Sequence, residues 1–319
     1  PAMTRPLSFA LLFVLLLAGC FALFGCDGGT SPDDAGPTPG DAASPSDAGP
    51  SEDAGPVFPE TLGPDERPAA YFLPSAHDGE TPLPVIILLH GYGASGDAQS
   101  TYFRLERLAR TEGFYLITPD GTVDSGGRRF WNATPACCDF ASTGVDDVAY
   151  LTGLLDQLES LVPVSDVYFM GHSNGGFMSY RMACELSDRI SGIVSLAGSD
   201  YLEPDACVPE NPVAVLQIHG DMDPTIAYDG GSIGEGYPSA PEAVERWATR
   251  NGCDTAMAAS GEDLDLDSSV DGAETTVTTY ESGCSANAGL WTIVGGGHIP
   301  PVTSDFTPAV LAWMRAQAR

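Results

Sequence analysis

Short apolar runs alternate with longer amphipathic stretches over most of the chain. The runs are PVIILLH, GFYLITPD, DVYFMGH, RISGIVSLAG, PVAVLQIHG and LWTIVGGGH, at residues 84–90, 113–120, 166–172, 189–198, 212–220 and 290–298. Continuous apolar runs of this length are typical of strands covered on both faces. Amphipathic periodicity predicts helices between them, at residues 98–111, 145–161, 174–187, 240–251 and 306–318. This alternation predicts an α/β fold with a mostly parallel central sheet and helices on both faces.

A different pattern opens the chain. Arg5 precedes an apolar stretch from Leu7 to Leu17, and LAGC follows, ending at Cys20. This order is typical of a secretory signal, and LAGC resembles the bacterial lipobox, whose cysteine is lipidated and anchors the mature chain. LFGC at Cys26 is a second match, with a bulkier phenylalanine, and an uncleaved apolar anchor from Leu7 to Gly25 is the third alternative. All three predict export.

Residues 1–26 are therefore predicted to be a signal or lipoprotein signal segment, and a spacer follows them. Residues 27–56 contain six prolines, six glycines and seven acidic residues, with DAGP at 34, 47 and 53. Such a segment buries too little apolar surface to offset its chain entropy, so we expect a disordered linker. Residues 57–319 remain as one catalytic domain, either secreted or held at the cell surface.

Charge and composition exclude several classes of function. The chain has 44 acidic and 13 basic residues, a net charge of −31, and all the basic residues are arginine. The acidic field disfavours nucleic acid and anionic membranes as partners, leaving an N-terminal lipid anchor as the only expected membrane contact. Without lysine, a Walker-type phosphate loop, a pyridoxal Schiff base and a Ser-Lys hydrolase are excluded.

Six cysteines lie in the predicted domain, an even number that indicates disulfides in an exported protein. We expect the pairs Cys253–Cys284 and Cys184–Cys207. The adjacent pair Cys137-Cys138 either closes a vicinal ring or reaches two other partners. No histidine lies near these cysteines at the spacing of a zinc finger, so no metal site is expected.

The sequence GHSNG, residues 171–175, joins the run at 166–172 to the helix expected at 174–187. It fits G-x-S-x-G, in which a sharp strand-to-helix turn exposes a nucleophilic serine. Glycines permit the turn, and the helix N-terminus stabilises developing negative charge. Alone, these residues would also fit an ordinary turn, but the flanking strand and helix favour Ser173 as a nucleophile.

A serine nucleophile needs a general base, and the chain has five histidines. His77 lies in a polar loop, while His90 and His219 each end a strand before a glycine. His172 adjoins the serine, where consecutive residues of a sharp turn project apart. His298 follows the last strand through three glycines, in the Ser, acid, His order of α/β-hydrolases. His298 is therefore the predicted base.

Two acids follow the run at 212–220 in HGDMDP and are candidates for the third group. Asp223 precedes a proline and lies far enough from the strand to reach across to His298, whereas Asp221 is expected to cap the turn. Spacing favours Asp223 as the acid that orients the imidazole and stabilises its protonated form.

LLHGYGASG places a glycine-rich turn directly after the first long strand. The backbone amide of Tyr92 in this turn, with that of Asn174, is expected to form an oxyanion hole. A glycine-rich turn without a ligand is the alternative.

Together, LLHGYGASG, TPDGTVDSGGRRFWNATPACC, VDDVAYL, GHSNGGFMSYRMACE, HGDMDP and WTIVGGGH resemble, over residues 67–315, the secreted α/β-hydrolase esterases of the polyhydroxybutyrate depolymerase-like family, which includes feruloyl esterases. The resemblance implies ester hydrolysis by Ser173, Asp223 and His298. Members that cleave polyesters tend to have Trp-Pro after the histidine and often cysteine at the position of Tyr92. This chain has IPP after His298 instead.

Three further features have a structural and a functional interpretation. Trp131 and Asn132 either line an acyl or sugar pocket or belong to the core. Asp146 and Asp147 open a helix, where carboxylates favour the positive end of the dipole. Residues 263–272, DLDLDSSVDG, lack the glycine and glutamate of a calcium loop and predict an acidic surface loop.

These observations predict a serine esterase that forms an acyl-enzyme and needs no cofactor. Its expected substrates are hydroxycinnamoyl esters of plant polysaccharide. Polyhydroxyalkanoate or short aliphatic esters are the alternative, so the partner is an ester that is either small or polymeric. Two other classes remain open: a non-catalytic surface binding module on a hydrolase scaffold, and a peptidase with the same triad.

Overall fold

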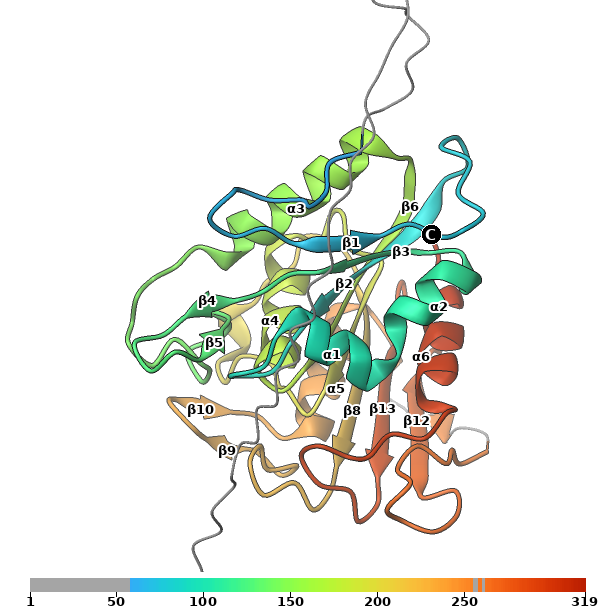
Figure 1. Cartoon of the computed structure of the whole chain (residues 1–319). Helices are drawn as coiled ribbons and strands as arrows, with labels where there is room; N and C mark the ends of the chain where they lie inside the picture. The colour runs from blue at the N-terminus through green and yellow to red at the C-terminus, as the bar shows by residue number, and fades with distance from the viewer. Residues whose placement is uncertain (1–57, 255–257, 260–261) are drawn as a thin grey trace, which may run out of the picture. The chain divides into compact units, whose positions relative to one another are not determined.

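The computed structural model describes residues 58–254, 258–259 and 262–319, which form a nine-stranded sheet with helices on both faces (Figure 1). The strand order across the sheet is β1-β3-β2-β6-β7-β8-β13-β12-β11. The strands are β1 (Ala70–Phe72), β2 (Leu83–Leu89), β3 (Tyr115–Thr118), β6 (Val164–His172), β7 (Gly192–Leu196), β8 (Ala214–Gly220), β11 (Ala258–Ala259), β12 (Thr275–Tyr280) and β13 (Ala288–Ile293).

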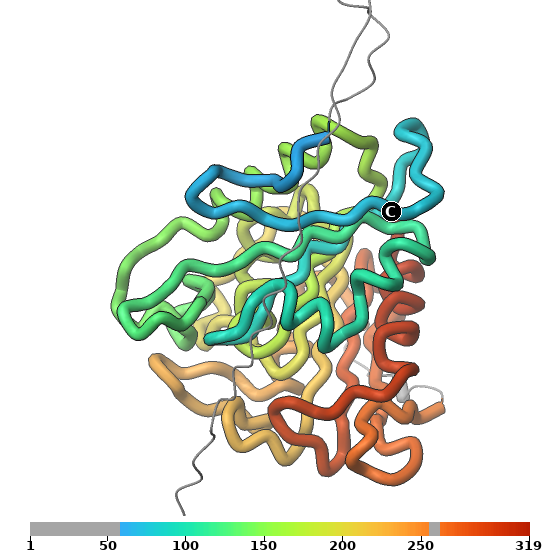
Figure 2. Tube along the Cα trace, viewed as in Figure 1, coloured from blue at the N-terminus to red at the C-terminus, as the bar shows by residue number. Residues whose placement is uncertain are grey.

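The six central strands, from β3 to β13 across the sheet, are parallel, whereas β1, β12 and β11 pair antiparallel at the two sides. The register places His172 opposite Leu196 and Gly220 opposite Ile293. The carboxyl ends of these strands therefore share one edge of the sheet. Figure 2 shows the red segment after β13 and the gold segment after β8 at that edge.

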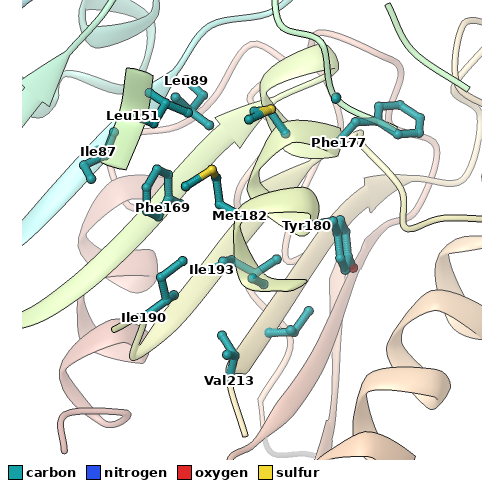
Figure 3. Packing of buried hydrophobic residues seen from close by; sticks show 14 of the residues in the cluster. Ile87, Leu89, Leu151, Phe169, Phe177, Tyr180, Met182, Ile190, Ile193 and Val213 are labelled. Carbon is teal, nitrogen blue, oxygen red and sulfur yellow. The ribbon is translucent and has the colours of Figure 1, made fainter. Parts of the chain in front are cut away.

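Alternation along the strands divides the core between the two faces. Ile87, Leu89 and Phe169 pack with residues of three helices on one face (Figure 3), while Ile86 and Leu88 pack with residues of the other three. The first face is covered by α3 (Asp147–Leu161), α4 (Asn174–Glu185) and α5 (Ala240–Arg250), and the second by α1 (Gly96–Phe103), α2 (Leu105–Glu112) and α6 (Phe306–Arg315). Burial on both faces explains why the strands have continuous apolar sequences.

Two small hairpins and a 3₁₀ turn lie outside the main sheet. β4 (Thr122–Val123) pairs antiparallel with β5 (Arg129–Phe130), and β9 (Gly231–Ser232) pairs antiparallel with β10 (Gly236–Tyr237). The 3₁₀ turn is η1 (Pro204–Ala206). The first hairpin follows β3 and the second follows β8, so both extend from the edge at which the parallel strands end.

The predicted fold class is confirmed, with two differences in detail. The helix expected at 98–111 is two helices, because Arg104 adopts a left-handed conformation with φ of 57°. Strands β1, β11 and β12 were not predicted. β12 reads TTVTTY and is only half buried, so it lacks the continuous apolar run that marks the central strands.

The disulfides Cys184–Cys207 and Cys253–Cys284 occur as expected. Cys137 and Cys138 bond to each other, which selects the vicinal alternative, and the peptide bond between them is cis. The Cys184–Cys207 disulfide links the end of α4 to the segment after η1. All six cysteines of the predicted domain are thus paired.

Candidate active site

Ser173 occupies the turn between β6 and α4, with φ of 55° and ψ of −119°. Close packing explains the glycines around it. A Cβ on Gly171 would lie 2.1 Å from the carbonyl oxygen of Gly175, and a Cβ on Gly175 would lie 2.2 Å from that of Leu89. Larger residues would push α4 away from β6 and β2, so the glycines permit the strained turn that exposes the serine.

His298 lies beside Ser173, although 125 residues separate them in the sequence. Its Nε2 is 3.0 Å from Ser173 Oγ, and its Nδ1 is 2.7 Å from Asp223 Oδ2. Since a carboxylate only accepts hydrogen bonds, Nδ1 carries the proton and donates to Asp223. Nε2 is then free to accept the serine proton. The structure brings the three residues together in the arrangement of a nucleophile, a base and an orienting acid.

Asp223 is held by its own loop. Its Oδ1 accepts hydrogen bonds from the amides of Thr225 and Ile226, at 2.8 and 2.9 Å. Burial alone would raise the pKa of Asp223, but hydrogen bonds from His219, His298 and the Ile226 amide outweigh it and hold the pKa well below its usual range. The carboxyl group is therefore ionised, as an acid that stabilises an imidazolium must be.

His219 contacts the loop that carries Asp223. Gln217 Nε2 donates to His219 Nδ1 at 2.9 Å, and His219 Nε2 donates to the carbonyl oxygen of Ile226 at 2.8 Å. His219 Nε2 also lies 3.4 Å from Asp223 Oδ2. His219 therefore hydrogen-bonds the loop that carries Asp223. Asp221, expected to cap the turn, accepts the amide of Gly295 at 2.6 Å and joins the loops after β8 and β13.

His172 has a role that the sequence did not indicate. Its Nε2 donates to the carbonyl oxygen of His298 at 2.8 Å, so the residue before Ser173 holds the loop that carries His298. Burial, with the nearby His298, lowers the pKa of His172 to about 4. The ring is thus neutral at pH 7.

The loop after β2 lies against the nucleophile. A Cβ on Gly91 would lie 3.5 Å from Ser173 Cβ, and the next amide along the chain belongs to Tyr92. Within the described residues, neither the Tyr92 amide nor the Asn174 amide donates to a protein acceptor. Unpaired amides next to a serine are the kind of donor that an oxyanion hole uses.

The sequence left Trp131 open between a substrate pocket and the core, and the structure decides for the core. Trp131 is fully buried, its Nε1 donates to the carbonyl oxygen of His90 at 3.0 Å, and its amide donates to Asn174 Oδ1 at 2.7 Å. It is a core residue that connects the loop after β2 to the start of α4. A large ring with one polar atom fits this buried position because that atom finds an acceptor.

Asn132 lines a hollow of about 450 Å³, bounded by residues 134–144 and by Gly234 and Glu235, and its use by a substrate stays a prediction. A second hollow of about 220 Å³ adjoins Tyr92 and the exposed side chain of Phe140. Phe140 is a lining residue that sequence reasoning missed, because a single aromatic residue in a polar loop has no periodic signal. Its ring stands edge-on to that of Tyr92, 5.6 Å between centroids.

The paired acids Asp146 and Asp147 are structural. Asp146 caps α3 by accepting the amide of Ala149 at 2.9 Å. Asp147 is buried and accepts from Arg67 at 2.6 Å and from the amide of Asn132 at 2.7 Å. The helix-opening role expected of the pair is confirmed for Asp146, and Asp147 additionally forms a buried ion pair.

The acidic segment 263–272 is less exposed than the sequence suggested. Asp267 is buried, and its Oδ1 accepts from the amide and the hydroxyl of Ser269, at 2.8 and 2.6 Å. Elsewhere, Cys184, Cys207 and Asp200 lie within 4.8 Å of one another. These are not free metal ligands, because the cysteines form a disulfide and Asp200 pairs with Arg250 at 2.7 Å.

Cys20, Cys26 and the predicted linker 27–56 lie outside the described residues. No helix among residues 58–254 and 262–319 has the length and apolar character needed to cross a bilayer.

Residues 76–237 match the phospholipase/carboxylesterase family. The chain is 29% identical over 247 residues to NocK of Nocardia uniformis subsp. tsuyamanensis, a protein named as an esterase, with 72% of this chain and 69% of that one aligned. It is 26% identical over 240 residues to feruloyl esterase B of Piromyces equi, covering 70% of this chain but only 41% of that protein. Its fold is that of acetyl xylan esterase from Aspergillus awamori, with a TM-score of 0.56 at 14% identity, over 82% of this chain and 98% of the other.

Proposed function

Because this chain belongs to the phospholipase/carboxylesterase family and is a carboxylic ester hydrolase, we propose that Ser173, His298 and Asp223 are its catalytic residues and that it hydrolyses hydroxycinnamoyl esters of plant polysaccharide. The observation that carries the proposal is the hydrogen-bonded series from Ser173 Oγ through His298 to Asp223, at 3.0 and 2.7 Å.

Acylation begins when Ser173 Oγ attacks the ester carbonyl carbon and His298 Nε2 takes the serine proton. The resulting imidazolium is stabilised by ionised Asp223. His298 then returns the proton to the leaving alcohol. In the second half-reaction, water attacks the acyl-enzyme with His298 again as base, which releases the acid and restores Ser173.

The tetrahedral intermediate places negative charge on the former carbonyl oxygen. The amides of Tyr92 and Asn174 are the proposed donors to this oxygen, and the start of α4 adds its positive dipole end. Preorganised donors of this kind lower the barrier because they need no reorientation as the charge develops.

The substrate class is supported by the names of relatives and by the hollow beside Tyr92. Feruloyl esterase B is among the relatives. Tyr92 and Phe140 form an aromatic wall next to the proposed oxyanion donor, which suits a phenolic acyl group. IPP after His298, in place of Trp-Pro, favours this class over polyesters.

We further propose that the domain is exported and is held at the cell surface through a lipid on Cys20. The three disulfides support an oxidising compartment. Replacing Cys20 with serine is expected to release the protein from the membrane fraction into the medium. Retention of the variant at the membrane would exclude anchorage at Cys20.

The direct test is a competition assay. Purified residues 57–319 receive methyl ferulate and a 3-hydroxybutyrate oligomer together, and both products are followed by chromatography with the variant Ser173→Ala as control. Release of ferulate ahead of oligomer cleavage, absent in the variant, is the expected result. Preferential oligomer cleavage would assign the enzyme to polyester hydrolysis. Ferulate ester binding without hydrolysis by the wild type would identify a binding module.

A further inference from the structure

The side chain of Tyr92 is fixed by two residues of the β4–β5 hairpin. Its hydroxyl donates to Asp124 Oδ2 at 2.6 Å. Arg128 lies over the ring, with its Cζ 4.9 Å from the centroid, and its Nε is 3.3 Å from the same carboxylate. The ring is therefore held by a hydrogen bond at its tip and by a cation on its face.

Asp124 is itself rigid, because its other oxygen is used within the turn. Oδ1 accepts the amides of Gly126 and Arg128, at 2.8 and 2.9 Å, and the Asp124 amide donates to the Arg128 carbonyl oxygen at 2.8 Å. The hydrogen bond from Tyr92 and those from these amides lower the pKa of Asp124 to about 2. The carboxylate therefore remains an ionised acceptor at neutral pH.

The main chain around Tyr92 is tied to the same segment. The Gly93 amide donates to the carbonyl oxygen of Arg129 at 2.7 Å. Ahead of Tyr92, His90 Nε2 accepts the amide of Gly121 at 2.8 Å, while His90 Nδ1 donates to the carbonyl oxygen of Gly91 at 2.8 Å. The peptide bond that carries the Tyr92 amide is thus bracketed by hydrogen bonds on both sides.

We propose that Asp124 is a positioning residue for ester hydrolysis: by holding the Tyr92 side chain, it orients the Tyr92 amide toward the developing oxyanion. This inference rests on the proposed function, in which that amide is an oxyanion donor. The loop after β2 is glycine-rich, so the contact of the Tyr92 side chain with Asp124 adds a restraint on this peptide to those from His90 and Gly93. A donor that must reorient during the reaction stabilises the transition state less than a fixed one.

The test uses Tyr92→Phe, which removes the hydroxyl and keeps the amide, and Asp124→Ala. The matched control is Asp78→Ala. Asp78 also accepts two backbone amides within its own turn, from Glu80 at 2.9 Å and from Thr81 at 2.8 Å, but among the described residues it forms no hydrogen bond with the loop after β2, and it lines neither hollow. For each variant, kcat and KM for methyl ferulate are measured, together with the rate of inactivation by a p-nitrophenyl alkylphosphonate, whose attack by the serine also creates an oxyanion.

Tyr92→Phe and Asp124→Ala are each expected to lower kcat about tenfold, less than the 10²- to 10³-fold loss of a whole oxyanion donor, while KM changes less than about twofold. Phosphonate inactivation should slow by the same factor. The double variant should be no slower than the worse single variant, because both changes release the same contact. Asp78→Ala should retain wild-type kcat within about twofold.

Wild-type kcat in both variants would overturn the proposal. So would a loss confined to KM, which would instead make Tyr92 and Asp124 binding residues, or a loss matched by Asp78→Ala, which would indicate general loosening of the structure. Failure of the proposed function is distinguishable, because it would appear as hydrolysis that survives in Ser173→Ala.

Discussion

Acidification from pH 7 to pH 4.5 is expected to destabilise the domain through His90 and His172. Both rings are buried, and burial lowers the pKa of each from its ordinary value of 6.5 to about 4. Because the unfolded chain takes up these protons near pH 6.5 and the folded chain only near pH 4, the free energy of unfolding falls as the pH falls between these values. The contribution of these two uncharged rings to the free energy of unfolding is therefore present at neutral pH and is lost on acidification.

The size of this loss of stability follows from the difference between the pKa of each histidine in the folded and in the unfolded chain. A shift of about 2.5 pH units corresponds to a little over 3 kcal/mol per histidine, of which about 2 kcal/mol is lost by pH 4.5. Two histidines together account for about 4 kcal/mol, a large part of the 5–15 kcal/mol typical of a folded domain.

Urea unfolding followed by the fluorescence of the four tryptophans measures this loss at pH 7, 6, 5 and 4.5. The variants His90→Gln and His172→Gln remove the titrating rings. Each glutamine can retain one hydrogen bond, by accepting the Gly121 amide or by donating to the His298 carbonyl oxygen. The double variant is expected to lose about 4 kcal/mol less than the wild type on acidification. A control, His77→Gln, changes a ring in a partly exposed loop and should leave the acid loss in place.

Two results would refute this reasoning. One is a wild-type free energy of unfolding that is the same at pH 4.5 as at pH 7. The other is an acid loss in the double variant as large as that of the wild type, which would assign the loss to carboxylates instead.

Three further changes have defined outcomes. Asp223→Asn should lower kcat about 10⁴-fold for methyl ferulate with little change in the circular dichroism spectrum, because the amide cannot hold the required tautomer of His298; activity within tenfold of the wild type would exclude Asp223 as the orienting acid. Replacing Cys184 and Cys207 by serine should lower the free energy of unfolding by about 3 kcal/mol, measured in urea. The reason is that the disulfide closes a loop between two residues that are 23 positions apart in the sequence. Trp131→Ala should cost about 3–5 kcal/mol of stability through the cavity it leaves, with the ratio of ferulate to acetate ester hydrolysis unchanged; a changed ratio would return Trp131 to the substrate pocket.

The grouping of Ser173, His298 and Asp223 was predictable from the sequence because each is tied to a local pattern. Gly171 and Gly175 are required by close packing at the turn, and this requirement is visible as G-x-S-x-G. His298 and Asp223 each follow the end of a strand, and parallel strands bring their carboxyl ends to one edge. The choice of Asp223 over Asp221 as the partner of His298 agrees with the structure, but the turn-capping role expected of Asp221 does not, since its carboxylate accepts the Gly295 amide of a neighbouring loop.

Other features depended on contacts between segments far apart in the chain. Trp131 in a Phe-Trp-Asn run is compatible with a pocket or with the core, and only its packing against His90 and Asn174 decides for the core. His172 could not be assigned to the loop of the base, because its partner lies 126 residues away. The edge strand β12, whose alternating polar residues resemble a loop, is defined by pairing with β13.

Local sequence therefore specified the six central parallel strands, their order along the chain and the chemical groups at their ends, since periodicity and glycine spacing act over a few residues. The tertiary structure decided which side chains support those groups. It brings Asp124 to Tyr92 and His219 to Asp223, and it places Phe140 in the lining of the hollow beside Tyr92. Such contacts form between side chains whose separation in sequence is set by the fold, so they leave no periodic trace in the chain itself.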